Sequence, residues 1–171
     1  RKSVFEAFAR LTTPARLVLA GARGWGTDAP ESMAKRAGIA DRFSYLGAVD
    51  DATLSSLYRH ASLLAMPSLY EGFGLPLLEA LSCGTPVLYG NNSSMPEVAG
   101  DAGLAVDATS VDAIAQGITC LLGDEALRTR LAARARAQAA KFSWDRAALE
   151  TLAVFEAAVA ARRDRMRRGT A

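Results

Sequence analysis

The sequence predicts an α/β fold, with a Rossmann-like, doubly wound and mainly parallel sheet that carries helices on both faces. Two observations lead to this prediction. Short apolar runs of strand length alternate along the chain with segments in which apolar residues recur at helical spacing. No internal repeat or low-complexity tract competes with this alternation. Strands that alternate with helices form parallel sheets, so we expect one sheet of about five or six strands.

The elements can be placed in order from the apolar runs and from the residues that interrupt them. The expected strands are residues 17–20, 43–46, 62–66, 87–89 and 104–106, of which the first is interpreted as buried. The expected helices are residues 3–11, 31–38, 52–60, 76–83, a short segment near Pro96, 110–122, 124–141 and 145–168. Gly84 is expected to end its helix in the left-handed conformation, and Asp50 with Asp51 to form the N-cap of the helix that follows them.

Composition and charge narrow the function classes. The chain has 171 residues, half of them apolar and 22% charged, which is ordinary for one soluble globular domain and excludes a disordered chain. The formal net charge is +2, and the one dense basic cluster is residues 162–168, so no nucleic-acid partner is expected. Two cysteines, Cys83 and Cys120, do not make a disulfide framework and suggest a reducing, cytoplasmic compartment.

Residues 65–86 bring together a strand end, a glycine-containing loop and a helix start, which is the arrangement of a ligand site. Gly72 and Gly74 allow positive φ in the loop. Leu75 is expected to be non-helical because it precedes a proline, and Pro76 suits the first helical position. The function of the chain is therefore sought here first.

The helix start in this stretch predicts an anion site. The amide N–H groups of Phe73, Gly74 and Leu75 would lie at the positive end of the helix dipole without acceptors inside the helix. Glu71 precedes the helix and Glu79 lies about one turn inside it, so both carboxylates can accept hydrogen bonds from hydroxyl groups around the bound anion. A sugar linked to a phosphate fits this arrangement. Taken singly, Glu71 could be a solvated loop residue and Glu79 a residue that the helix dipole stabilises.

The joint pattern of Pro67-Ser68, Glu71-Gly72-Phe73-Gly74 and Glu79 resembles the Glu-x7-Glu motif of retaining GT-B glycosyltransferases, which use nucleotide-sugar donors. The resemblance extends over nearly the whole chain. Further segments follow in the order typical of that family's C-terminal, donor-binding domain: Ala-Arg-Leu-Val-Leu-Ala-Gly, Phe-Ser-Tyr-Leu-Gly, Gly-Thr-Pro-Val-Leu, Pro-Glu-Val-Ala-Gly-Asp-Ala-Gly and Phe-Ser-Trp.

The resemblance implies roles for individual residues. Glu71 would position the donor sugar and Glu79 would bind the ribose. The diphosphate would lie against the backbone from Gly72 to Leu75 and against Lys2, for which a frayed terminal lysine is the alternative interpretation. Val49 would contact the base, or would be an ordinary core valine.

The resemblance also implies what surrounds this domain. The loop at residues 91–95 would border the donor sugar. The family's domain opens with a strand and a glycine-containing loop, of which Arg1-Lys2 matches only the end, so we expect residues 1–171 to be a donor-binding domain that lacks its first strand, with residues 145–168 as its terminal helix. A missing N-terminal domain would bind the acceptor.

The sequence therefore predicts the donor-binding half of a retaining glycosyltransferase that transfers a hexosyl group, with a resemblance to mannosyltransferases in the 91–97 loop, to a glycan or lipid-linked acceptor. No cofactor or metal is expected, because no two aspartates are spaced Asp-x-Asp. A nucleotide-sugar 2-epimerase and a non-catalytic nucleotide-binding module remain alternatives. The basic cluster at 162–168 leaves open a peripheral contact with the inner face of a membrane, or a solvated helix end.

Overall fold

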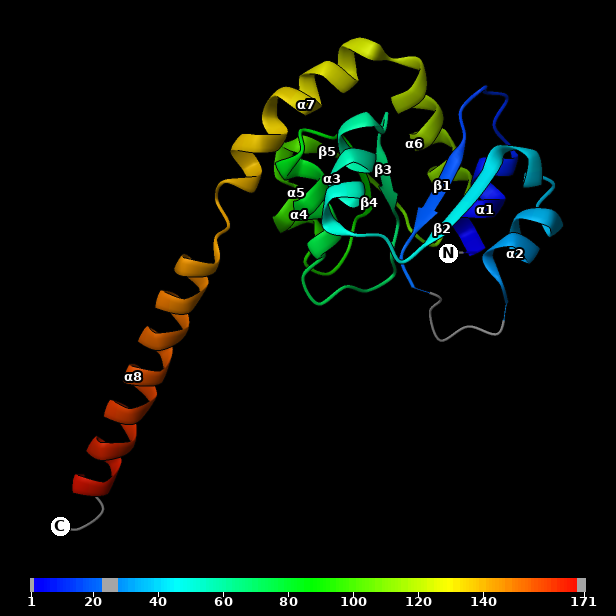
Figure 1. The fold of residues 1–171 in the computed structure, drawn as a ribbon. Coiled ribbons are helices and arrows are strands. Elements are labelled where there is room, and N and C mark those ends of the chain that lie inside the picture. Colours follow the sequence, from blue (N-terminus) through cyan, green and yellow to red (C-terminus); the bar gives the residue numbers. More distant parts are fainter. Residues whose placement is uncertain (1, 23–27, 169–171) are drawn as a thin grey trace. The chain divides into compact units, whose positions relative to one another are not determined.

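The computed structural model describes residues 2–22 and 28–168 (Figure 1). Arg1 therefore lies outside the described residues. The chain divides into two compact units, Arg1–Ala139 and Ala140–Ala171, which we call unit 1 and unit 2. All the strands belong to unit 1, and unit 2 consists of one long helix with the residues that flank it.

The elements follow the predicted alternation of strand and helix. The strands are β1 (Leu17–Ala20), β2 (Phe43–Gly47), β3 (Leu64–Met66), β4 (Val87–Gly90) and β5 (Gly103–Val106). The helices are α1 (Lys2–Ala9), α2 (Pro30–Arg36), α3 (Asp51–His60), α4 (Leu75–Ser82), α5 (Met95–Ala99), α6 (Val111–Gly123), α7 (Glu125–Ala139) and α8 (Trp144–Arg168), with short 3-10 turns η1 (Ala40–Arg42) and η2 (Gly100–Ala102). Every expected element is present, with ends that differ by a few residues.

The strands pair in parallel, as predicted, but in two sheets and not in one. β1 pairs with β2, and β3, β4 and β5 form a second sheet in that order. The expectation of one continuous sheet is thus wrong for the described residues, because β1 and β3 do not pair with each other.

Helices cover both faces of the larger sheet, as in a doubly wound fold. Side chains of a strand alternate between the two faces, and those of β4 belong to different hydrophobic clusters. Leu88 packs in a cluster with residues of α1 and α6, whereas Val87 and Tyr89 pack in a second cluster with residues of α4, α5 and α7. The first cluster includes Phe5, Phe8, Ile114, Ile118 and Leu121, and the second includes Leu77, Leu81, Val98 and Ala135.

The smaller sheet corrects the expectation that the first strand is buried. Leu17 and Leu19 pack against the first hydrophobic cluster, but Val18 is 46% exposed and Leu46, in the paired strand β2, is 44% exposed. Successive side chains of a strand point to opposite faces. Only one face of this sheet is therefore covered in the described structure.

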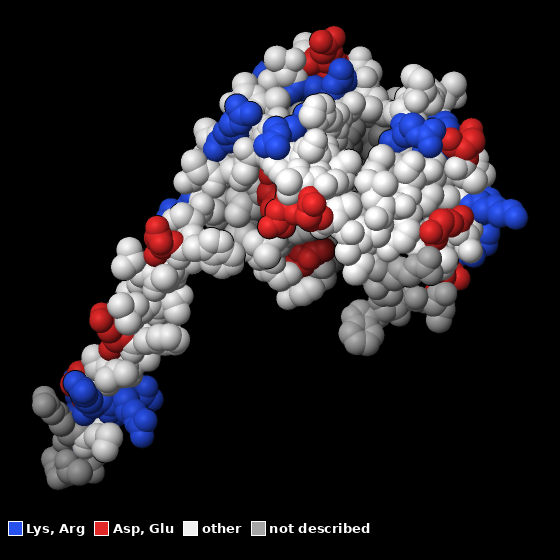
Figure 2. All heavy atoms as spheres, viewed as in Figure 1, with Lys and Arg blue, Asp and Glu red and all other residues white. Residues whose placement is uncertain are grey.

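Unit 2 is the helix α8 with its flanking residues. The described side chains of α8 are all exposed, including Trp144, Leu152 and Phe155. Lys and Arg side chains gather at its C-terminal end (Figure 2). No helix among the described residues is long and apolar enough to cross a membrane.

Candidate active site

The carboxyl ends of β3 and β4 lead into two loops that lie against each other. The first loop, residues 67–74, connects β3 to α4, and the second, residues 91–94, connects β4 to α5. The space between them is tight at Gly90, the last residue of β4, where a Cβ atom would lie 2.5 Å from the carbonyl oxygen of Ser68 and 3.0 Å from the Cβ of Ala108. The last residue of β4 must therefore be a glycine for the two strand ends to stay together.

Side chains of the second loop bind backbone groups of the first. The hydroxyl of Ser94 donates to the carbonyl oxygens of Glu71, at 3.1 Å, and Phe73, at 2.9 Å. The hydroxyl of Ser93 donates to the carbonyl of Glu71 and accepts from its amide, at 3.3 Å. The amide group of Asn92 donates to the carbonyl of Ser68, at 3.2 Å. Three side chains of the second loop thus fix the loop that carries Glu71, through five hydrogen bonds to its backbone.

Ser93 adopts a conformation that suits this role. Its φ is +57°, in the left-handed region that residues other than glycine adopt infrequently. Such conformations persist where surrounding contacts hold them, and here the two hydrogen bonds to the backbone of Glu71 do so.

The start of α4 is as predicted in outline and different in detail. Gly74 is left-handed, with φ +93°, whereas Gly72 is not among the residues of positive φ. The helix begins at Leu75, so the expectation that Leu75 is non-helical is wrong. The left-handed Gly74 turns the chain into the helix, which begins at Leu75, one residue before Pro76. A proline in the first turn loses no hydrogen bond, because the first N–H groups of a helix have no acceptor inside it.

Of the two glutamates expected at the site, Glu71 precedes this helix start and Glu79 follows it. Glu71 is half-buried in the first loop, and Glu79 is exposed on α4. The Tyr58 hydroxyl, from α3, donates to Oε2 of Glu79 at 3.0 Å. Burial and this hydrogen bond raise the pKa of the Tyr58 phenol above its ordinary value. Tyr58 therefore remains a hydrogen-bond donor at neutral pH.

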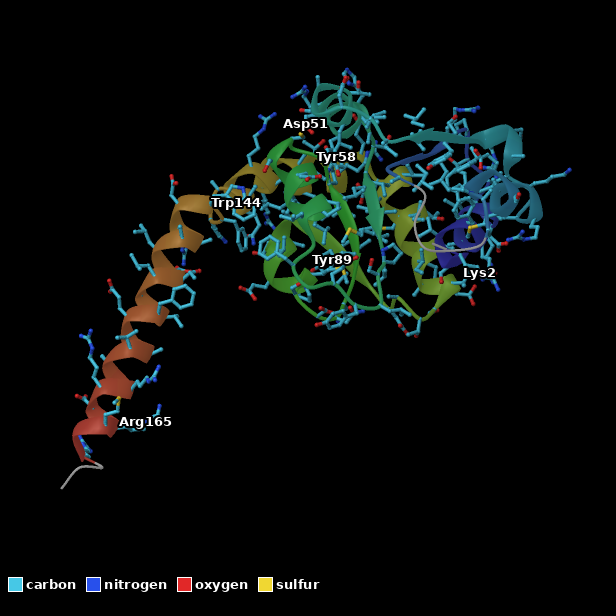
Figure 3. The ribbon with its side chains drawn as sticks, turned by 60° about the horizontal axis from the view of Figure 1, so that its bottom comes forward. Lys2, Asp51, Tyr58, Tyr89, Trp144 and Arg165 are labelled. Carbon is cyan, nitrogen blue, oxygen red and sulfur yellow. The ribbon has the colours of Figure 1, made fainter. Side chains whose placement is uncertain are left out.

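The remaining predicted residues lie farther from α4. Val49 is half-buried in the loop between β2 and α3, and the next residue, Asp50, caps α3 as expected by accepting from the amide of Thr53 at 2.7 Å. Lys2 is exposed, and its Nζ lies 3.7 Å from Oε1 of Glu6 on the same helix. The N-terminal end of α1 lies on the side of unit 1 to which β1 points (Figure 1), but Lys2 is well separated from Tyr58 (Figure 3).

The site of residues 65–94 thus presents carboxylates and a helix N-terminus at the carboxyl edge of a parallel sheet, where α/β folds bind ligands. The described residues contain no group of three or more His, Cys, Asp or Glu side chains placed to hold a metal ion. Sequence reasoning missed Tyr58, because no local pattern connects it with Glu79, 21 residues away.

The family of the chain follows from a sequence comparison. Residues 2–138 match the family described as glycosyl transferases group 1. The chain belongs to this family. The match includes the whole site and ends one residue before the end of unit 1.

Similar proteins of assigned function extend the comparison. The chain is 44% identical over 140 residues to O-antigen chain mannosyltransferase B of Escherichia coli, which covers 82% of this chain and 37% of that protein. It is 38% identical over 150 residues to D-inositol 3-phosphate glycosyltransferase of Salinispora arenicola, covering 85% of this chain and 34% of that protein. The chain thus spans a little over a third of the length of these relatives.

Solved structures confirm the fold. Sucrose-phosphate synthase from Thermosynechococcus elongatus matches with a TM-score of 0.78 and 27% identity over 94% of this chain and 42% of that chain. HepE from Anabaena, solved in complex with UDP-glucose, matches with a TM-score of 0.73 and 22% identity over 82% of this chain and 40% of that chain. The α/β fold of this group 1 glycosyltransferase chain matches the C-terminal domains of GT-B glycosyltransferases.

Proposed function

We propose that this chain is the donor-binding domain of a retaining glycosyltransferase, which transfers a hexosyl group, and specifically a mannosyl group, from a nucleoside diphosphate sugar to a glycan or lipid-linked acceptor. The observation that carries the proposal is the fixed loop of residues 67–74, which presents Glu71 immediately before the N-terminus of α4 while Glu79 lies one turn inside that helix. The 44% identity to a mannosyltransferase favours mannose among the hexoses.

Each part of the site has a role in this proposal. The N-terminus of α4 binds the diphosphate, because N–H groups and the helix dipole favour an anion there. Glu79 accepts hydrogen bonds from the ribose, and Glu71 positions the sugar. Transfer is accelerated by stabilising the departing diphosphate, which becomes more negative in the transition state, and Lys2 adds to this stabilisation. Val49 contacts the base.

Retention through two displacements requires a carboxylate nucleophile on the far face of the sugar. Sequence reasoning identifies none, so we propose departure and attack on the same face. Trapping a covalent glycosyl-enzyme with a donor analogue would contradict this route.

The first experiment is a titration of the 171-residue chain with uridine and guanosine diphosphates, by calorimetry, with and without EDTA. We expect weak binding that EDTA does not change, because none of the proposed contacts uses a metal. We also expect no sugar transfer by this chain alone, because an acceptor must be held within about 3 to 3.5 Å of the anomeric carbon in an oriented site. Binding that disappears with EDTA, robust transfer by the chain alone, or formation of an epimerised nucleotide sugar would contradict the proposal.

The second experiment compares Glu79→Gln with Glu71→Gln. Glu79→Gln is expected to weaken nucleoside diphosphate binding by about 1.5 to 3 kcal/mol, the contribution of hydrogen bonds to a charged group. Glu71→Gln is the matched control, because it removes the same charge from a loop whose backbone ties remain. Glu71→Gln is expected to leave the affinity for the bare nucleoside diphosphate unchanged. It is expected to reduce the discrimination between donor sugars. Equal affinities of Glu79→Gln and wild type for the nucleotide would rule out the ribose contact.

A further inference from the structure

Tyr58 joins α3 to α4 at the carboxylate that the proposed function assigns to the ribose. Its hydroxyl donates to Oε2 of Glu79 at 3.0 Å. The bond uses one of the two carboxylate oxygens and leaves the other, Oε1, for a further donor. Tyr58 is therefore placed to decide which way the carboxylate of Glu79 points.

Tyr58 is itself held by contacts that do not involve Glu79. The hydroxyl of Thr85, which is 3% exposed, donates to the carbonyl oxygen of Tyr58 at 2.6 Å. The aromatic ring is half-buried and packs against the second hydrophobic cluster, which contains Leu77 and Leu81. A side chain fixed at its backbone and along its ring gives its hydroxyl a defined position.

Glu79 needs such a support because its side chain is exposed. A free glutamate samples many rotamers, and a ligand that immobilises it loses part of its binding free energy to that ordering. A hydrogen bond from a fixed donor orders the carboxylate before the ligand arrives. The phenol remains the donor across the neutral pH range, since burial raises the pKa of Tyr58.

We propose that Tyr58 is a positioning residue that orients Glu79 to receive the vicinal hydroxyl groups of a nucleotide ribose. This inference rests on the proposed function, because it takes the ribose assignment of Glu79 from it. Tyr58 does not touch the ligand in this proposal. Its effect is confined to ligands that have the hydroxyl pair.

The test measures binding of guanosine and uridine diphosphates and of their 2′,3′-dideoxy counterparts to wild type, Tyr58→Phe and Glu79→Ala. Tyr58→Phe is expected to weaken binding of the ribonucleotides roughly threefold to tenfold, as the loss of one hydrogen bond implies. Its affinity for the dideoxynucleotides should equal that of wild type. Added to Glu79→Ala, Tyr58→Phe should have no further effect, because the group that it positions is gone.

Tyr89→Phe is the matched control. It also removes a phenol hydroxyl from a tyrosine of the second hydrophobic cluster, but the pKa of Tyr89 is raised by burial and by the nearby charge of Asp101, without a contribution from Glu79. Its affinity for both kinds of nucleotide should be unchanged. Thermal unfolding of all variants shows whether a loss of binding follows from a loss of structure.

The outcomes separate the inference from the proposed function. If wild type prefers ribonucleotides and loses the preference in Glu79→Ala, but Tyr58→Phe behaves as wild type, the positioning role is overturned and the function stands. An equal loss for ribo- and dideoxynucleotides in Tyr58→Phe also overturns it, since that result indicates a general structural effect. If wild type binds neither kind of nucleotide, the proposed function fails and the inference fails with it.

Discussion

Gly90→Ala is expected to lower the free energy of unfolding of unit 1 by about 3 kcal/mol, the upper end of the usual cost of overpacking. The new methyl group would lie 2.5 Å from the carbonyl oxygen of Ser68, a distance at which the backbone must move. It would also lie 3.0 Å from Nδ2 of Asn92, so it would disturb the hydrogen bond between Asn92 and Ser68. Urea unfolding followed by circular dichroism measures the loss.

Gly123→Ala is the control for this substitution. Gly123 is the last residue of α6, and a Cβ atom there would meet nothing within 4 Å. The free energy of unfolding of Gly123→Ala should be unchanged or raised by up to about 1 kcal/mol, because alanine favours the helix. If Gly90→Ala proved as stable as Gly123→Ala, that result would contradict the close packing of the Ser68 carbonyl oxygen against Gly90.

Leu77→Ala is expected to cost about 3 to 5 kcal/mol of unit 1 stability. The Leu77 side chain is fully buried on α4, with its Cδ1 atom 3.3 Å from the position that a Cβ on Gly74 would occupy. Truncation removes the contacts of the side chain and leaves a cavity directly beneath the left-handed turn that starts the helix. Nucleotide binding should weaken in parallel, since the helix N-terminus loses its support.

The matched control is Leu149→Ala. Leu149 lies on α8 and is 69% exposed, so its truncation should change the free energy of unfolding by less than about 0.5 kcal/mol. Both variants are compared by urea unfolding. Similar midpoints for the two variants would contradict the burial of Leu77 in the second hydrophobic cluster.

The sequence was informative where local chemistry dictates local structure. The left-handed glycine that ends α4, Gly84 with φ +82°, and the cap of α3 by Asp50 were predicted correctly, because each depends on a residue and its immediate neighbours. The alternation of strands and helices also gave the parallel pairing. The loop from Glu71 to Gly74 could be proposed as a candidate site for the same reason, since its residues are contiguous, and its role in binding stays a prediction.

Features that depend on tertiary contacts were not predictable in this way. α4 starts at Leu75, although the following proline disfavours the helical conformation there, and side chains of Met66 and Met95 from other elements lie against the left-handed Gly74 that precedes it. The exposure of Val18 depends on which strands are neighbours, and the sequence does not encode this locally. The bond between Tyr58 and Glu79 joins two helices that only the packing of α3 on α4 brings together.

The ties between the two loops have a consequence for how such a site changes through evolution. Ser93 and Ser94 bind the carbonyl oxygens of Glu71 and Phe73, and Asn92 binds that of Ser68, so all these acceptors belong to the main chain. Every amino acid carries the same carbonyl. The side chains of the first loop can therefore be exchanged during evolution while the loop keeps its shape, so the surface that the loop presents can change without a change in its backbone.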